Sequence, residues 1–383
     1  MSEPRPFTLH VPDEALADLR DRLARTRLPD RSPGTPWAYG TDRDWLAATL
    51  ASWRDGFDWR AAEAALNALP NYKVAIGGID LHYIHASGKG PNPTPLLLSH
   101  GWPGSVFEFL DIIPRLTDPA SYGGDPADSF TVVAPSLPGY GLSFSPGQQR
   151  FGINAIADIF AELMSSLGYE RFLAQGGDWG ASITTRLGYA HPDRLHGIHL
   201  NMLPVGRDPK ALGEKTADEK RYAAELEAFL KDETGYQQIQ GTKPDTLAAA
   251  LSDSPAGLTA WIGEKYYRWS DHDGDVWSAI PRKRGLGNIA LYWFTGAIGS
   301  SFWPYYARVH GERPVPDGGR VDVPTAHAAF PREILHPPRS LAERTFTDIR
   351  RWTAMEKGGH FAALEQPEAL ARDIAAFART LRS

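Results

Sequence analysis

The sequence contains no cysteine, and this absence excludes several kinds of chemistry at once. Disulfide bonds, CxxC redox motifs, thiolate nucleophiles and cysteine-ligated zinc all need that residue. A catalytic nucleophile in this chain must therefore use oxygen or nitrogen.

An excess of positive charge is also missing, since 46 acidic residues face 40 basic ones and the formal net charge is -6. Proteins that bind nucleic acid need a basic surface for the phosphate backbone, so no nucleic-acid partner is expected. No run of about 18 apolar residues occurs, and the N-terminus lacks the basic and apolar regions of a signal peptide. These absences predict a soluble, cytoplasmic protein without a membrane anchor.

What the chain does contain is typical of a folded enzyme of some size. Its 383 residues are 42% hydrophobic and 22% charged, which excludes a disordered chain. The length allows a large core with an inserted or appended domain. No repeat or low-complexity tract interrupts it.

Residues 1–90 predict an N-terminal meander before the main body of the fold. Between Asp13 and Arg27, leucines recur at helical spacing and predict one short helix. Tryptophans then follow among prolines and glycines, too irregularly for one long helix, and are expected to pack the meander onto a larger body. From 72 to 85, apolar and polar residues alternate on both sides of Gly77-Gly78, which predicts a hairpin.

After the hairpin, short apolar runs alternate with glycine-rich loops and helical segments, as in a parallel sheet with right-handed crossovers. The stretch 205–305 has no buried-strand pattern and predicts a helical cap inserted between two parts of an α/β core, 91–204 and 306–383. Strands are predicted at 96–98, 131–134, 171–175, 195–201, 320–325 and 345–353, and helices at 154–168, from 181, and at 367–381.

The pentapeptide Gly176-Gly177-Asp178-Trp179-Gly180 lies between a predicted strand and a predicted helix. A nucleophile elbow of the α/β-hydrolase fold requires small residues on both sides of a strained central residue, and Gly176 and Gly180 meet that requirement. Asp178 then stands in the nucleophile's place. Taken alone, the string could also be a glycine-rich turn with an aspartate capping a helix.

Two further segments fit such an elbow. His360 follows the last predicted strand, and the fold needs its histidine after the nucleophile and the acid in the chain. His100-Gly101-Trp102-Pro103 follows the strand at 96–98, where the fold places an oxyanion-hole amide. Because Pro103 has no N–H, the expected donors are the backbone N–H groups of Trp102 and Trp179. The side chain of His100 is expected to hold the loop.

These residues resemble the epoxide hydrolases of the microsomal type, including their soluble bacterial members, over nearly the whole chain. Gly235-Tyr236-Gln237-Gln238-Ile239-Gln240 resembles the family's segment with the first cap tyrosine, and Ser300-Ser301 followed by Tyr305 its segment with the second. Phe330-Pro331-Arg332-Glu333 resembles the segment with the acid, and Gly358-Gly359-His360-Phe361 the segment with the histidine. The residues around Tyr305 depart from the family pattern, so Tyr306 is an alternative second tyrosine. The sequence also shows no segment like the membrane anchor of the microsomal enzymes, so a soluble protein is expected.

The resemblance implies conversion of a small-molecule epoxide and water to a vicinal diol. An aspartate is ionised at neutral pH and can attack without a base, whereas the leaving alkoxide needs the hydroxyls of Tyr236 and Tyr305 as acids. The resulting ester on Asp178 would be hydrolysed by water that His360 activates, with Glu333 orienting the imidazole. The H-E-x-x-H, P-loop and G-x-G-x-x-G patterns are absent from the sequence, so no metal and no nucleotide cofactor are expected. A homodimer is the default assembly.

The aromatic-rich cap favours a bulky or aryl epoxide, in detoxification or in natural-product biosynthesis. Asp322 and Asp348 are alternative acids, and the acidic cluster 271–275 is expected to be a solvated loop, since it lacks EF-hand spacing. Two other functions stay open. A haloalkane or haloacid dehalogenase also uses an aspartate but needs no acid for its leaving group, and a non-catalytic ligand-binding protein of the same fold would need none of these residues together.

Overall fold

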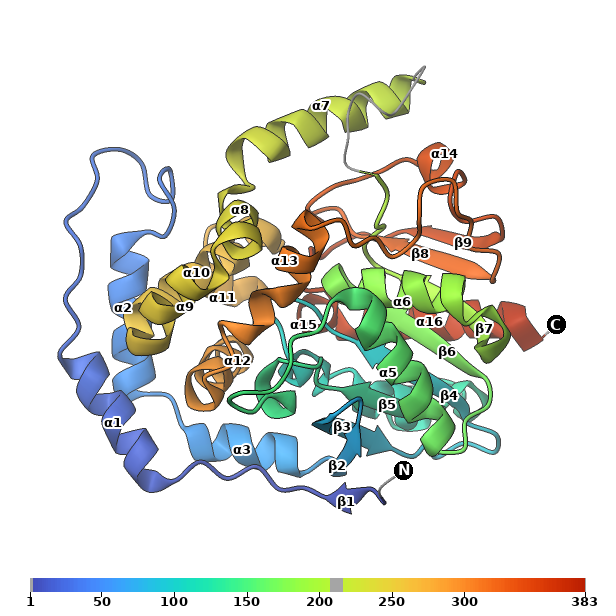
Figure 1. Cartoon of the computed structure of the whole chain (residues 1–383), viewed down its shortest axis with the longest axis horizontal. Coiled ribbons are helices and arrows are strands. Elements are labelled where there is room, and N and C mark those ends of the chain that lie inside the picture. The colour runs from blue at the N-terminus through green and yellow to red at the C-terminus, as the bar shows by residue number, and fades with distance from the viewer. Residues whose placement is uncertain (1–2, 207–215, 383) are drawn as a thin grey trace.

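The computed structural model describes residues 3–206 and 216–382, and Figure 1 shows how their helices and strands are arranged. The strands form one nine-stranded sheet in this part of the chain, in the order β1-β2-β3-β5-β4-β6-β7-β8-β9. The pairs from β5 to β9 are parallel, and β1, β2 and β3 are antiparallel additions at one edge. The strands are β1 (Arg5–Pro6), β2 (Asn71–Ile76), β3 (Ile79–Ala86), β4 (Thr94–Ser99), β5 (Phe130–Pro135), β6 (Phe172–Gly176), β7 (Leu195–Leu200), β8 (Thr325–Ala329) and β9 (Ile349–Ala354).

Helices cover both faces of the sheet, and a group of helices is inserted between β7 and β8 (Figure 1). α5 packs against α6, and α4 packs against α16. The predicted fold class, an α/β fold with a mostly parallel sheet and a helical insertion, is confirmed. The helices are α1 (Asp13–Ala24), α2 (Arg43–Asp55), α3 (Trp59–Asn67), α4 (Ile113–Thr117), α5 (Ile153–Ser166), α6 (Asp178–Ala190), α7 (Ala217–Asp232), α8 (Gly235–Thr242), α9 (Pro244–Asp253), α10 (Pro255–Trp269), α11 (Val276–Ala279), α12 (Arg282–Thr295), α13 (Trp303–Val309), α14 (Arg339–Ala342), α15 (Ala362–Glu365) and α16 (Pro367–Arg382).

The core strands consist of the apolar runs that the sequence shows. Leu96, Leu97 and Leu98 of β4 are fully buried between the two helical layers. The predicted hairpin is also present, with both Gly77 and Gly78 at positive φ in the turn between β2 and β3. Burial on both faces explains why these strands lack alternation. β2, next to the edge strand β1, alternates only at its end, where Val74 and Ile76 are buried and Ala75 is exposed.

The predicted strand at 320–325 is wrong in position. Val321 makes only an isolated bridge to Phe346, and the strand that joins the sheet is β8, which starts after Pro324. A proline has no N–H for the ladder, so continuous pairing begins beyond it. β8 has the sequence TAHAA, whose small residues give no strong apolar signal.

The N-terminal region is more helical than the predicted meander, since α2 and α3 were not foreseen. Each begins at an aspartate that caps the first turn. The side chain of Asp42 accepts hydrogen bonds from the N–H groups of Asp44 and Trp45, and that of Asp58 from Ala61. Both helices have apolar residues at helical spacing, but the prolines and glycines of the surrounding stretch obscured this pattern in the sequence.

Aromatic residues join the N-terminal region to the inserted helices. Trp37 stacks on Tyr267 of α10 with ring centres 4.0 Å apart, and Trp45 stacks on Trp277 at 5.7 Å. A Cβ atom on Gly263 of α10 would overlap the ring of Trp45, so the two helices approach closely there. The residues 207–215 of the expected cap lie outside the described part of the chain. The N-terminal region thus packs against α10 and α11 of the inserted group of helices.

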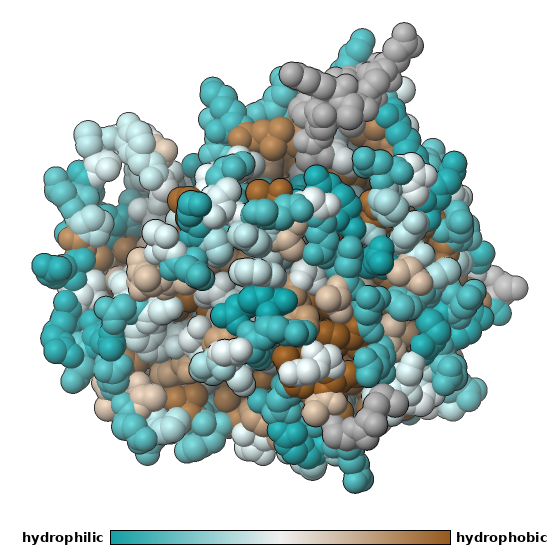
Figure 2. Space-filling model, in the orientation of Figure 1, coloured by the Kyte–Doolittle hydropathy of each residue, from teal (hydrophilic) through white to brown (hydrophobic). Residues whose placement is uncertain are grey.

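Hydrophilic side chains cover most of the face in Figure 2, with hydrophobic ones between them in small groups. Within residues 3–206 and 216–382, no helix combines the length and the apolar character needed to cross a bilayer.

Gly180 gives a test of how tightly the start of α6 packs against β4. A Cβ atom there would overlap the backbone carbonyl of Ser99, which cannot move without disturbing the sheet. We expect Gly180→Ala to lower the free energy of unfolding by about 2 kcal/mol or more. Gly235→Ala is the matched control, because no atom lies within 4 Å of its added Cβ, and should change stability by less than about 0.5 kcal/mol. Urea denaturation measures both, and equal effects would contradict this packing.

Candidate active site

Asp178 lies at a sharp turn between β6 and α6, at the carboxyl ends of the parallel strands. Its φ of 50° falls in the left-handed region, which is rare for a residue other than glycine. A Cβ atom on Gly176 would overlap the backbone of Gly180 across the turn, and one on Gly180 would overlap the backbone of Ser99 at the end of β4, so both positions need glycine. The sequence G-G-D-W-G therefore forms the strained elbow that it predicts, with the aspartate at its apex.

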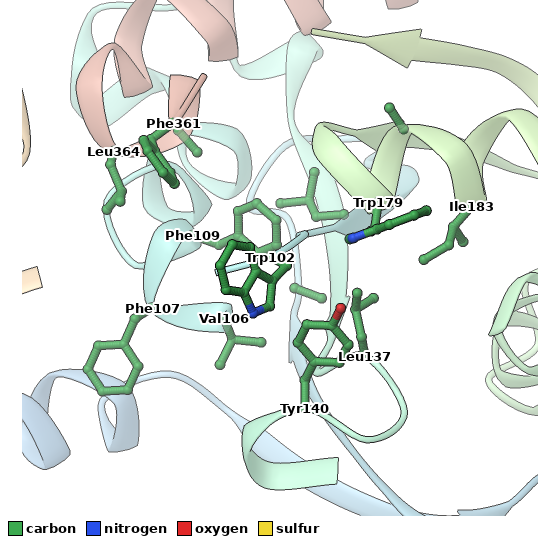
Figure 3. Close-up of a cluster of buried hydrophobic side chains, with 14 of the residues drawn as sticks. Trp102, Val106, Phe107, Phe109, Leu137, Tyr140, Trp179, Ile183, Phe361 and Leu364 are labelled. Atoms are coloured by element: carbon green, nitrogen blue, oxygen red, sulfur yellow. The ribbon is translucent and has the colours of Figure 1, made fainter. Parts of the chain in front are cut away.

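The carboxylate of Asp178 is held between two loops. The backbone N–H of Trp102 donates a hydrogen bond of 2.8 Å to Oδ1, and Nε2 of His360 lies 3.4 Å from Oδ2. Trp179, whose N–H was expected to be the second donor, follows Asp178 in the first turn of α6. Figure 3 shows the indoles of Trp102 and Trp179 in one buried cluster with Tyr140 and Leu137. An apolar surround of this kind strengthens the electrostatic contacts of the carboxylate.

His100 holds the loop that carries Trp102. Its imidazole is buried, Nε2 accepts a hydrogen bond from the N–H of Leu137, and Nδ1 donates to the carbonyl of Gly101. Burial lowers the pKa of His100 to about 4, so the ring is neutral at pH 7. This agrees with the structural role predicted for it.

His360 and Glu333 form a buried pair. The Nδ1 atom of His360 and Oε1 of Glu333 are 2.6 Å apart, and both side chains are almost completely buried. Burial lowers the pKa of His360, but the charges and hydrogen bonds of Glu333 and Asp178 outweigh it and raise the pKa to about 10. Because the imidazole lies between two carboxylates, it carries a proton at neutral pH.

The loop of His360 is fixed by its backbone. Its N–H donates to the carbonyl of Trp269, and the carboxylate of Glu365 accepts hydrogen bonds from the N–H groups of Gly359, Phe361 and Asp271. The position of the imidazole is thus determined by contacts from both the cap and the core.

Tyr236 of α8 and Tyr305 of α13 face Asp178 from the cap. Their ring centres are 5.7 Å apart, Tyr236 stacks on Trp102, and Tyr305 meets Trp179 edge to face at 4.7 Å. Both phenols are buried and line a cavity of about 760 Å³ that also reaches Asp178. Burial, with the charges of Tyr236 and Asp178, raises the pKa of Tyr305 well above its usual range, so its hydroxyl keeps its proton.

Tyr306 points elsewhere. Its ring stacks between Trp303, at 4.6 Å, and His310, at 3.9 Å, and it is not among the residues that line the cavity. The geometry thus favours Tyr305 over Tyr306 as the second tyrosine that faces Asp178.

The alternative acids lie away from His360. Asp322 accepts a hydrogen bond from Thr347, and Asp348 pairs with Arg350 on the surface. In the acidic cluster 271–275, the side chain of Asp271 accepts a hydrogen bond from the N–H of Gly358. The described residues contain no group of three or more His, Cys, Asp or Glu side chains that could hold a metal ion.

Two residues of the site were not foreseen. The ammonium group of Lys265 lies 4.2 Å from the ring centre of Tyr236 and is also paired with Glu264. The carboxyl of Glu108 lines a second, smaller cavity beside Asp178 and His360. The pattern Ser105-x-x-Glu108 signals only a helix start, and Lys265 has no motif at all, so neither could be placed from the sequence.

Comparisons with known proteins agree with this geometry. Residues 4–109 match the family model "Epoxide hydrolase N terminus", and residues 94–367 match "alpha/beta hydrolase fold". A putative epoxide hydrolase of Stigmatella aurantiaca is 43% identical over 99% of this chain and 85% of its own length. Epoxide hydrolase 1 of the rabbit, Oryctolagus cuniculus, is 39% identical over 97% of this chain and 88% of its own. The described site thus lies in an α/β hydrolase with an epoxide-hydrolase N-terminal region.

Solved structures give the same assignment. The epoxide hydrolase of Aspergillus niger superposes with a TM-score of 0.87 and 31% identity, covering 99% of this chain and 97% of that one. The juvenile hormone epoxide hydrolase of the silkworm Bombyx mori gives a TM-score of 0.89 and 30% identity, covering 100% and 95%. The chain belongs to the epoxide hydrolase family, whose members are hydrolases that act on epoxides, and the predicted resemblance is confirmed.

Replacing Glu333 tests the charge coupling of His360. The pKa of His360 is about 6.5 in the unfolded chain and about 10 in the folded protein. Protonation of His360 therefore stabilises the fold fully below pH 6.5, and this contribution is lost as the pH rises toward about 10. We expect Glu333→Gln to lower the free energy of unfolding most at pH 6.5, with the difference from the wild type shrinking between pH 6.5 and 10. Urea denaturation across that range measures it.

Glu225→Gln is the control for this experiment. Glu225 raises the pKa of the partly exposed His336, so its replacement should show the same trend with a smaller amplitude. A loss of stability in Glu333→Gln that does not change with pH would contradict the coupling.

Proposed function

We propose that this protein hydrolyses an epoxide to a vicinal diol through a covalent ester on Asp178. The observation that carries the proposal is the position of one carboxylate, at a strained elbow, between a protonated imidazole on one side and two buried phenols on the other. The strained backbone of Asp178 and the convergence of these groups on its carboxylate support a catalytic role.

The first step is attack of Asp178 on a ring carbon. One carboxylate oxygen forms a bond to that carbon as the carbon–oxygen bond of the epoxide breaks, and the electron pair of the broken bond stays on the epoxide oxygen. The hydroxyls of Tyr236 and Tyr305 hydrogen-bond that oxygen, and one of them gives it a proton. The product is a hydroxyalkyl ester of Asp178, and the tyrosine regains its proton from solvent.

Lys265 assists the acid in this step. Its positive charge, 4.2 Å from the ring centre of Tyr236, stabilises the negative charge that develops on the phenol as it donates.

Ester formation changes the charge around His360. The carboxylate of Asp178 is one of the two that raise the pKa of His360, and its negative charge disappears in the ester. The imidazole then loses its proton more readily and can serve as a base. Glu333, at 2.6 Å, continues to orient the ring and to stabilise its cation.

The second step is hydrolysis of the ester. Water attacks the carbonyl carbon of Asp178 and gives a proton to Nε2 of His360, which later passes it to the departing alkoxide of the diol. The developing oxyanion lies on the side chain of Asp178, whose Oδ1 already accepts a hydrogen bond from the N–H of Trp102. The N–H of Trp179 is the proposed second donor. Losing one such donor would cost about 3 kcal/mol in the hydrolytic step.

The cavity suggests the size of the substrate. Its volume of about 760 Å³ and its buried tyrosine and tryptophan walls suit a bulky or aryl epoxide, the class that the aromatic cap favours. We infer a role in detoxification or in biosynthesis, in the cytoplasm, by a monomer or a homodimer. A panel of aryl, alkyl and polycyclic epoxides, with chiral analysis of the diols, distinguishes these substrates.

His360→Ala tests the covalent intermediate. We expect turnover to fall on the order of 10³-fold or more, because the ester forms but no base activates water. Mass spectrometry after incubation with styrene oxide should find one substrate mass added to the peptide of Asp178. Asp178→Asn is the control and should stay unmodified. An unmodified peptide in His360→Ala, despite demonstrated binding, would contradict the mechanism.

The cap tyrosines are tested one at a time. Tyr236→Phe and Tyr305→Phe should each slow ester formation by about 10- to 100-fold in single-turnover experiments, since one acid remains in each variant. Tyr306→Phe is the matched control and should react at the wild-type rate. A loss in Tyr306→Phe with no loss in Tyr305→Phe would reverse the assignment.

A dehalogenase is the alternative function. If the protein released halide from chloroalkanes and did not react with epoxides, the proposed epoxide hydrolysis would be wrong and the dehalogenase would be supported.

A further inference from the structure

Glu108 is a buried carboxyl beside the site that the two proposed steps leave without a role. It lies in the short 3-10 helix η1 (Val106–Phe109), just after the loop that carries the N–H of Trp102. Its side chain folds back over that loop and lies against Gly104, where an added Cβ atom would overlap its Oε1 atom. The backbone of Ser105 also hydrogen-bonds the carboxyl. The carboxyl of Glu108 is therefore held beside the loop that carries the N–H of Trp102.

Glu108 faces the same small cavity as the reacting groups. This cavity has a volume of about 20 Å³, and its walls include Asp178, His360 and Glu108. A cavity needs about 10 to 15 Å³ to hold one water molecule, together with two or more polar partners. Burial raises the pKa of Glu108 to about 8, with His360 opposing and Asp178 adding to the shift. The cavity can thus hold one water between polar groups.

The epoxide cavity and this small cavity meet Asp178 from different sides. Tyr236, Tyr305 and Trp179 line the first, and Glu108 and His360 line the second. Among the residues that the structure describes, Asp178 is the one that lines both. A substrate carbon and a water molecule can therefore reach the same carboxyl group without competing for space.

We propose that Glu108 positions the hydrolytic water in the small cavity, an inference that rests on the covalent mechanism proposed above. The water gives one proton to Nε2 of His360 and keeps its second O–H, which donates a hydrogen bond to a carboxyl oxygen of Glu108. Its oxygen bonds to the carbonyl carbon of the Asp178 ester, and the carbonyl electron pair moves onto the oxygen beside the N–H of Trp102. Collapse of this intermediate expels the diol oxygen, which takes the proton from His360.

The physical reason for a second partner is orientation. A water held only by His360 can rotate about that hydrogen bond, and a second bond directs its lone pair at the carbonyl carbon. Gly101 helps to keep the approach open, because a Cβ atom there would overlap the carboxylate of Asp178.

A purely structural role for Glu108 makes a different prediction. The side chain of Ser105 caps η1 by accepting a hydrogen bond from the N–H of Phe107, and Glu108 contributes to the same turn. If capping were its only role, loss of Glu108 would weaken the fold and slow both chemical steps alike. Water positioning affects only the hydrolysis of the ester.

The experiment measures both steps in single turnover with the full chain and styrene oxide. In Glu108→Leu, ester hydrolysis should slow by about tenfold, the loss of one hydrogen bond to a reacting group, while ester formation stays within about twofold of the wild type. Intact mass should then show the ester accumulating. Glu108→Gln keeps an acceptor oxygen and should hydrolyse the ester within about threefold of the wild type. Ser105→Ala, the capping control, should leave both rates unchanged.

Three outcomes would overturn the role of Glu108: hydrolysis at the wild-type rate in Glu108→Leu, an equal fall of both steps, or a loss in Glu108→Gln as large as that in Glu108→Leu. If Glu108→Leu does not fold, Glu108→Met gives the same measurement. Failure to trap any ester in His360→Ala is a separate result, which would overturn the covalent mechanism itself. An ester trapped there, with normal hydrolysis in Glu108→Leu, would remove only the role of Glu108.

Discussion

The site depends on one strained turn. Asp178 adopts a left-handed backbone conformation that few residues tolerate, and it can do so only because Gly176 and Gly180 let β6, α6 and β4 approach one another. The strain is offset by the buried sheet and helices on both sides. Because of this turn, the carboxylate projects beyond the end of the sheet, where the Trp102 loop, the His360 loop and the cap contact it. Without this turn, the carboxylate of Asp178 would not reach His360, the N–H of Trp102 and the cap tyrosines.

Charge coupling links the two halves of the proposed reaction. His360 lies between the carboxylates of Asp178 and Glu333, and both raise its pKa. While Asp178 is free, the protonated imidazole stabilises the carboxylate at the position from which it attacks. Once Asp178 is an ester, one of those charges is gone and the imidazole becomes a better base. The same three residues thus suit attack first and hydrolysis second, with no movement of the backbone required.

Much of the fold and of the candidate site could be predicted from local signals. The apolar runs of β4 and β5, the glycine turn between β2 and β3, and the G-G-D-W-G elbow are dictated within a few residues, since burial on both faces, tight turns and strained angles restrict the residue types allowed. The strand near Pro324 was predicted too early in the chain, because the alanine-rich sequence of β8 carries no hydrophobic signal. α2 and α3 were missed because prolines and glycines surround them in the sequence, although each has an apolar stripe at helical spacing.

The sequence by itself determined which groups are available, namely an aspartate at an elbow, a histidine after the last strand and an acid between them, with no thiol that could take their place. Only the tertiary structure decided which tyrosine faces Asp178, because Tyr305 and Tyr306 are neighbours in the chain but point to different surroundings. It also decided that Glu108 and Lys265 belong to the site. Side-chain direction and burial arise from contacts between segments far apart in the sequence, and no local pattern records them.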